Sequence, residues 1–231
     1  VTGEAIPPIR VWLIAMLAGV FGSTGLILLY AAMANGTMSI AAPVSALLAA
    51  ALPVLVGTLT EGLPERLTLI GFGFALFAVW MVSQSEGGVK YILSHLADLK
   101  LPLLAGIGFG GYFVIMHRAT DEGALLWAMT GSRTSSVILI FIYMLVTRTS
   151  FRIEDRSSFP VIGLNGILDL TGNAFFILAA QAGRLDVASV LSSLYPGSTV
   201  MLAWIFLHER LTRNQWIGIA AALIAIVLMT L

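Results

Sequence analysis

The chain has 231 residues, of which 58% are hydrophobic and 10% are charged, with 12 basic residues, 12 acidic residues and no cysteine. Soluble domains of this size carry about 25% charged residues, so the composition excludes a soluble domain. The zero net charge excludes a nucleic-acid partner, which requires a basic surface. Without cysteine there is no disulfide or thiolate metal site, and none of the three histidines lies at metal-ligand spacing from another. We therefore expect a membrane protein with neither a metal nor a cofactor.

Apolar runs divide most of the chain. A helix needs about 20 apolar residues to cross the hydrocarbon core of a bilayer. Eight runs approach this length, and in chain order they are Val11–Met33, Met38–Leu59, Leu67–Ser83, Leu101–Met116, Ala124–Thr147, Val161–Ala182, Val187–Leu207 and Gln215–Leu231. Only two charged residues, Arg133 and Asp169, fall inside these runs, and all five tryptophans lie near run ends, as interfacial residues do. The pattern predicts an all-α, polytopic membrane bundle.

The chain also repeats part of itself at an interval of 147 residues. This interval aligns the first three runs with the last three without a gap. It superposes four glycine pairs, which are Gly19 and Gly166, Gly25 and Gly172, Gly36 and Gly183, and Gly71 and Gly218. Because equivalent runs are five runs apart, an odd number, the second copy should cross the membrane in the opposite direction. Inverted repeats are typical of secondary transporters, whose substrate site lies near the midplane between the two copies.

The two copies differ in length. We assign residues 1–83 to a first half with three runs, residues 84–100 to a linker, and residues 101–231 to a second half with five runs. By symmetry two further runs should precede the first, so that eight of an expected ten are visible. Two explanations stay open: a fragment of a ten-span protein, which valine at position 1 favours, or an eight-span variant.

The C-terminal half resembles the second half of an EamA domain. The resemblance rests on Ala188–Pro196, His208–Thr212 and Gln215–Gly218, with first-half counterparts in Ala42–Pro53, Glu61–Arg66 and Ile70–Gly71. EamA domains belong to the drug/metabolite transporter superfamily, whose members are typically ten-helix inner-membrane proteins built from two inverted halves. The resemblance implies a multi-pass protein of the inner (plasma) membrane that moves a small organic solute. It does not identify the solute, and the missing helix pair departs from the family pattern.

Asp169 is the strongest candidate for a functional residue. It lies eight residues into its run, at a depth of about 12 Å, where a charge costs at least ~2.5 kcal/mol; Thr171 and Asn173 follow it. Two interpretations stay open: a group that binds substrate or carries a coupling proton, or a structural acid satisfied by hydroxyls or by Arg133. For Arg133, at a similar depth in the preceding run, we favour a side chain that snorkels to the membrane surface.

Two prolines mark a second candidate region. Pro53 and Pro196 should interrupt their helices, because each removes one backbone hydrogen bond. Ser192, Ser193 and Tyr195 cluster around the second proline. As a group they are predicted to line a solute pathway, although hydrogen bonds between helices would explain each one singly. By contrast, the GxxxG spacing of Gly106–Gly110 predicts close helix packing.

These features predict a secondary transporter that works by alternating access, with proton coupling left open. The alternatives are a passive channel, a membrane subunit without transport, or an inactive fragment. No catalytic motif is present, so no enzyme is expected. The expected partners are the solute and the bilayer, with a homodimer left open. Loop charges place the C-terminus outside the cell, whereas the family resemblance places it in the cytoplasm, and we follow the family.

Overall fold

The computed structural model describes residues 6–34, 38–82, 99–120, 124–149, 158–208 and 211–230. The regular elements within these ranges are helices. In chain order they are α1 (Ile9–Ala32), α2 (Met38–Glu61), α3 (Arg66–Val82), α5 (Lys100–Thr120), α6 (Leu125–Thr147), α7 (Phe159–Ala182), α8 (Leu185–Ser193), α9 (Tyr195–Leu207) and α10 (Arg213–Thr230). Each predicted run coincides with one or two of these helices, which confirms the all-α class.

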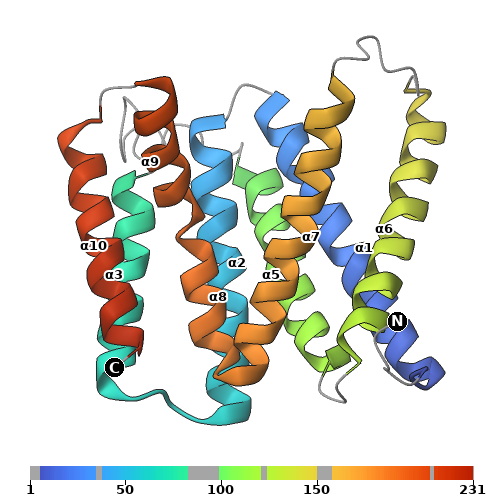
Figure 1. Cartoon of the computed structure of the whole chain (residues 1–231), viewed down its shortest axis with the longest axis horizontal. Coiled ribbons are helices and arrows are strands. Elements are labelled where there is room, and N and C mark those ends of the chain that lie inside the picture. Colours follow the sequence, from blue (N-terminus) through green and yellow to red (C-terminus); the bar gives the residue numbers. More distant parts are fainter. Residues whose placement is uncertain are drawn as a thin grey trace.

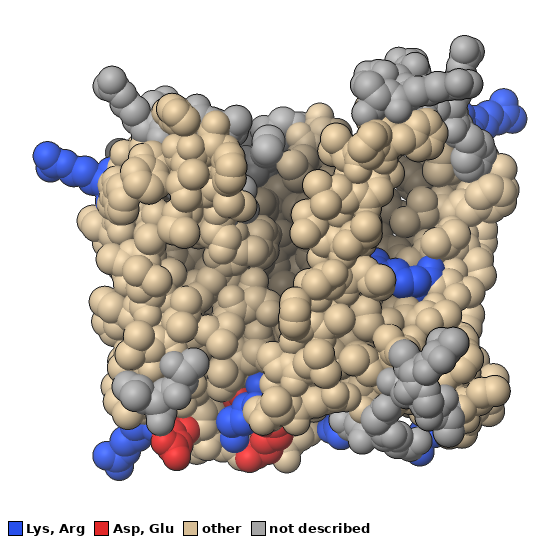
Figure 2. Space-filling model, in the orientation of Figure 1, with Lys and Arg blue, Asp and Glu red and all other residues tan. Residues whose placement is uncertain are grey.

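Several of these helices have the dimensions of membrane spans. By length and composition, α1, α5, α6, α7 and the Val44–Glu61 part of α2 can each cross a bilayer, while α3 and α10 are shorter apolar helices. The predicted run Val187–Leu207 is divided between α8 and α9. In Figure 2 the visible charged side chains gather mainly at two opposite ends of the molecule. The chain is a multi-pass helical membrane protein.

The crossings alternate in direction. Both chain ends lie at the lower end of the bundle in Figure 1, where α1 starts upwards and α10 finishes downwards. Helices α1 and α3 rise, whereas their counterparts at the 147-residue interval, α7 and α10, descend. The helices of the first copy therefore run opposite to their counterparts in the second copy. The inverted sense predicted from the sequence is confirmed.

Glycines of α5 allow three helices to pack closely. Helix α5 packs against both α1 and α2. A Cβ atom at Gly106 would lie 2.5 Å from Leu48 Cβ of α2, and one at Gly108 would lie 2.7 Å from Gly25 Cα of α1. Gly110, one turn after Gly106, also faces α2. The close packing predicted for the GxxxG spacing is confirmed.

Among the residues that the structure describes, two apolar clusters make up the core. One gathers residues of α1, α5, α6, α7 and α8 and includes the fully buried Met116 and Ile177. The other gathers residues of α2, α3, α8 and α10 and includes Val79 and Val190. Helix α8 contributes to both clusters, so a movement of α8 would disturb both.

The two copies of the repeat are packed unequally. Helix α1 packs against α5 and α6, and it buries Ala15, Ala18, Gly19, Gly25 and Ala32. The equivalent residues of α7 are all exposed, and they are Ile162, Asn165, Gly166, Gly172 and Ala179. A Cβ atom at Gly166 or Gly172 would have no neighbour within 4 Å. The described part of the chain therefore leaves uncovered the face of α7 that corresponds to the buried face of α1.

Candidate functional site

The two charged residues inside the predicted spans form an ion pair. Arg133 Nη2 of α6 lies 2.5 Å from Asp169 Oδ2 of α7, and the side chains are 40% and 50% exposed. The structure thus has the ion pair between Arg133 and Asp169 that was left open as the alternative to a snorkelling arginine. Because α6 and α7 are consecutive and antiparallel, the two residues meet at a similar depth. Pairing there is less costly than leaving either charge alone in the membrane.

Asn173 extends this ion pair by one helical turn. Its Nδ2 donates to the Asp169 carbonyl oxygen at 2.8 Å and to Asp169 Oδ1 at 3.2 Å. Thr171 does not join the group, because its hydroxyl donates to the Ile167 carbonyl oxygen at 2.7 Å and its side chain is exposed. The structure therefore brings together three of the four residues predicted here, and leaves Thr171 on another face of α7.

A cavity of about 280 Å³ adjoins the ion pair. Residues of four helices line it, among them Gly22 and Ser23 of α1, Phe109, Tyr112 and Phe113 of α5, Arg133 and Ser136 of α6, and Asp169 and Asn173 of α7. Gly22, the repeat counterpart of Asp169, lies in the same cavity. The cavity thus has one charged and polar wall, formed by α6 and α7, and one aromatic wall, formed by α5.

The serines and the tyrosine predicted around Pro196 line a second cavity. It has a volume of about 260 Å³. Its lining includes Ala46 and Ala49 of α2, Phe109 and Phe113 of α5, Ser189, Ser192 and Ser193 of α8, and Tyr195 of α9. Ser189 and Ser193 each donate to a carbonyl oxygen of their own helix. The second cavity is therefore less polar than its lining residues alone indicate.

The two prolines have different effects on their helices. Helix α8 ends at Ser193 and α9 begins at Tyr195, so Pro196 occupies the first turn of α9, where its missing N–H has no helical partner to lose. Helix α2 runs unbroken from Met38 to Glu61 through the buried Pro53. The predicted interruption is thus present at Pro196 and wrong at Pro53.

Phe109 and Phe113 separate the two cavities. Both residues of α5 line each cavity, so the cavities share this aromatic wall. The ring of Phe113 also packs against Phe176 of α7, with ring centroids 4.3 Å apart. The sequence reasoning missed these aromatic residues. Their spacing of four residues beside the glycines of α5, which places them on one helix face, was the available signal.

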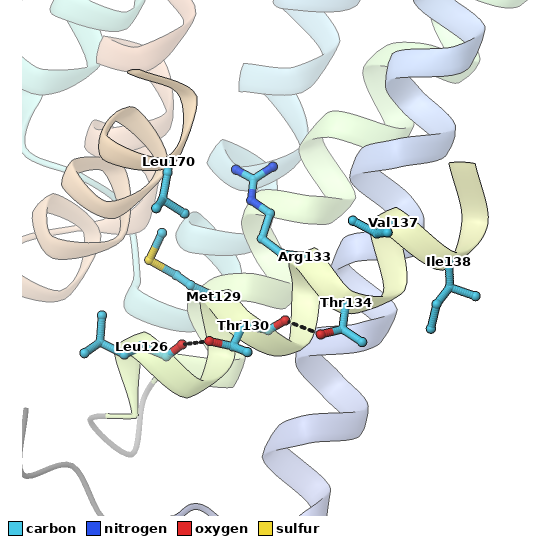
Figure 3. Close-up of a pocket in the computed structure, with 8 residues that line it drawn as sticks. All are labelled: Leu126, Met129, Thr130, Arg133, Thr134, Val137, Ile138 and Leu170. Atoms are coloured by element: carbon cyan, nitrogen blue, oxygen red, sulfur yellow. Dashed lines mark hydrogen bonds between the residues drawn. The ribbon is translucent and has the colours of Figure 1, made fainter. Parts of the chain in front are cut away.

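A third cavity opens between α6 and α7. It has a volume of about 560 Å³, and Figure 3 shows its lining residues, which are Leu126, Met129, Thr130, Arg133, Thr134, Val137, Ile138 and Leu170. The two threonine hydroxyls donate to carbonyl oxygens of α6 at 2.8 Å. Arg133 is the charged member of this lining. In this structure the ion pair can therefore be reached from the side of the bundle.

Sequence reasoning also missed a charged group at the lower end of the bundle, which we call the Arg184 cluster: Glu61, Gly62, Arg184 and Asp186. Asp186 is fully buried, and Arg184 donates to both of its carboxylate oxygens, at 3.1 and 2.9 Å. Asp186 Oδ1 also accepts the Val187 N–H at 2.8 Å. Hydrogen bonding to Asp186 raises the pKa of Arg184 above its ordinary value. An acid immediately before an apolar run, two residues after an arginine, was the available signal.

Comparison with known proteins assigns the family. The model of the EamA-like transporter family matches residues 98–231, which is more than half of the chain. This chain belongs to the EamA-like transporter family. An uncharacterized protein of Methanocaldococcus jannaschii is 29% identical to this EamA-like chain over 94 residues, which cover 41% of the chain and 69% of that protein.

A solved crystal structure shares the fold described here. It superposes with a TM-score of 0.77 over 97% of this chain and 77% of the other, at 16% sequence identity. At this identity the likeness concerns the fold alone. Family membership and several apolar helices together indicate a membrane protein with a transporter-type role.

Proposed function

We propose that this EamA-like protein is a secondary transporter that moves a small organic solute across the inner (plasma) membrane by alternating access. Its solute site comprises the cavity beside Arg133, Asp169 and Asn173, together with the adjoining cavity of Ser192, Ser193 and Tyr195. The observation that carries this proposal is the ion pair within the bundle, which faces a cavity lined by four helices.

Electrostatics support a binding role for the ion pair. Charged side chains inside a membrane protein are costly unless they face a partner or a cavity, and they commonly mark substrate or ion pathways. Here the pair is only half-buried, so both groups can exchange part of their mutual bonding for bonds to a polar solute. Protonation of Asp169 would weaken its hold on Arg133, which makes Asp169 the group through which a proton would be coupled to transport.

The two-cavity arrangement supports a solute with two unlike ends. The cavity of the ion pair offers an acid, a base and an amide, whereas the cavity beside α8 is lined by alanine, phenylalanine and small hydroxyl residues. A polar end would bind near Asp169 and a less polar end beyond Phe109 and Phe113.

We further propose that the pathway lies between two inverted halves, residues 1–83 and 101–231. Helices α2 and α8, which are equivalent in the repeat, pack against each other between them. In this arrangement the second half supplies the charged residues of the site, since Gly22 occupies the position of Asp169 in the first half.

Transport by the purified protein in proteoliposomes tests this proposal. A solute is first identified by its effect on thermal unfolding, from a panel of amino acids, nucleosides and sugars. The wild type should then show saturable uptake and counterflow, and Asp169→Asn should abolish both. Thr171→Val is the matched control on the same helix, because Thr171 lines neither cavity of the proposed site.

Each alternative has its own result. A passive channel would show flux without saturation or counterflow, and a membrane subunit without transport would show no flux. If Asp169→Asn leaves saturable, pH-dependent uptake unchanged, Asp169 is not part of the site.

A further inference from the structure

The Arg184 cluster lies where two equivalent helices of the repeat meet. Helix α2 ends and α8 begins at the lower end of the bundle in Figure 1, and the two helices pack against each other. Acidic and basic side chains are side by side at this end in Figure 2. A contact here therefore joins the first half of the chain to the second.

Arg184 makes this contact directly. While its guanidinium holds Asp186 on α8, its Nη2 donates to the Gly62 carbonyl oxygen at 2.7 Å and its Nη1 donates to that of Glu61 at 3.4 Å. The Glu61 carboxylate lies 3.8 Å from Arg184 Nε. The arginine thus bonds to the C-terminal end of α2, and Asp186 lies at the N-terminal end of α8. Both charges are placed where the helix dipoles favour them.

Close approach of the two backbones depends on Gly57. A Cβ atom at Gly57 would lie 3.1 Å from Asp186 Cβ and 3.3 Å from its backbone nitrogen. Any larger residue at this position of α2 would push the start of α8 away. The contact therefore combines a tight helix crossing, a buried carboxylate and a bridging guanidinium.

The sequence has no such arrangement at the other end of the repeat. At the 147-residue interval, Trp204 corresponds to Gly57, Ser39 to Asp186 and Thr37 to Arg184. A tryptophan cannot allow the approach that glycine allows. Trp204 instead packs against Trp216 of α10, with ring centroids 5.5 Å apart. The two ends of the α2 and α8–α9 crossing are thus chemically different.

The solute cavity lies close above this contact. Ser189, which lines the cavity beside α8, follows Asp186 by three residues, or about 4.5 Å along the helix. Figure 2 shows the surface hollowed in the upper middle part of the molecule, on the side away from the Arg184 cluster. The cluster therefore stands between the cavity and the lower surface.

From this placement we infer that the Arg184 cluster is a gate that holds the lower end of the solute pathway closed. Opening this end requires α2 and α8 to part at Gly57, and the bonds from Arg184 to the carbonyl oxygens of Glu61 and Gly62 must break. Arg184 and Asp186 are positioning residues for transport, because they touch helix ends and not the solute. The inference rests on the proposed alternating access.

The absence of native cysteine provides a direct test. A single cysteine at Ser189 reports access to the cavity through its rate of reaction with a membrane-impermeant maleimide. The rate is measured from each membrane face, in intact cells and in inverted vesicles, which needs no known solute. Arg184→Lys keeps a positive charge beside Asp186. It loses the branched guanidinium group, which binds Asp186 and the Gly62 carbonyl oxygen at the same time.

We expect Arg184→Lys to raise the labelling rate from the lower face and to lower the rate from the upper face. The rise should be about tenfold, because a tenfold change corresponds to the free energy of one charge-assisted hydrogen bond. Gly57→Ala should act in the same direction, because its methyl group separates the helices. Arg66→Lys is the matched control, since Arg66 is an exposed arginine at the same end.

The remaining outcomes overturn the gate. Labelling that both variants leave unchanged would make the cluster a static helix cap. An equal rise from both faces would indicate general loosening. Failure of the gate is distinct from failure of the proposed function: the first shows in the labelling of Ser189→Cys, the second in solute uptake by Asp169→Asn.

Discussion

Helices α1 and α6 cross so closely at Gly19 that a single methyl group there should destabilise the protein. A Cβ atom at Gly19 would collide with the Ser132 carbonyl oxygen and with Ser135 Oγ, and would lie 2.8 Å from the Ser132 carbonyl carbon. Two hydrogen bonds also join these helices, from Ser135 Oγ to the Met16 carbonyl oxygen at 2.7 Å and from Ser136 Oγ to that of Gly19 at 3.2 Å. Gly19→Ala must therefore move α6 or break its bonds to α1.

The repeat offers a matched comparison for the size of this effect. Overpacking at Gly19 costs about 1–3 kcal/mol, the two interhelical bonds contribute about 0.6 kcal/mol each, and alanine improves helix propensity by about 0.5–1 kcal/mol. The expected result is a loss of about 2 kcal/mol. At the equivalent Gly166 a Cβ atom meets nothing within 4 Å, so Gly166→Ala keeps only the gain in propensity. The two variants should differ by about 3 kcal/mol in the free energy of unfolding.

Reversible unfolding in mixed detergent micelles, followed by circular dichroism, measures this difference. Equal effects of the two substitutions, or a larger loss for Gly166→Ala, would refute the packing of α1 against α6. A loss of stability in Gly166→Ala would also show that the exposed face of α7 is covered in the micelle.

Two further predictions concern charged residues. Arg133→Met should destabilise the protein by about 2 kcal/mol or more, because it leaves Asp169 unpaired in the membrane. Adding Asp169→Leu should restore most of that stability without restoring saturable uptake. The same unfolding and uptake assays check both outcomes. Transport by the double variant would show that the ion pair has only a structural role. Because folding raises the pKa of Arg184, the stability that Arg184 contributes is complete below the ordinary pKa of an arginine side chain and is lost only as the pH rises through the raised value. The difference in unfolding free energy between the wild type and Arg184→Gln should therefore stay constant from about pH 6 to about pH 9, and a difference that vanishes toward the alkaline end of denaturation curves would contradict this.

Much of the fold could be predicted because hydropathy determines which segments cross a bilayer. The eight runs and the break at Pro196 follow from local properties of the chain, and the inverted sense follows from the 147-residue repeat. Pro53 differs because α2 is packed on both sides, by α5 and α8, which keeps the helix continuous around the missing hydrogen bond. Packing of this kind involves residues that are distant in the sequence.

The candidate site was predicted only where helical spacing brings residues together. Asp169 and Asn173 are four residues apart and share a face of α7, whereas Thr171, two residues from each, lies on another face. The depth of Arg133 and Asp169 allowed an ion pair without requiring one. The Arg184 cluster could not be predicted, because charged residues in a short connection are usually solvated, and Asp186 is buried only through the approach of Gly57 from a helix about 130 residues earlier.

Reciprocal motion of the two ends tests the central claim most directly. Spin labels would be attached in pairs to introduced cysteines, at Leu59 and Ala182 to report on the lower end and at Tyr30 and Phe206 to report on the upper end. All four residues are exposed. Distances measured by double electron–electron resonance, with and without the transported solute, should change in opposite directions at the two ends. Distances that stay constant at both ends, or that change in the same direction, would contradict alternating access by inverted halves.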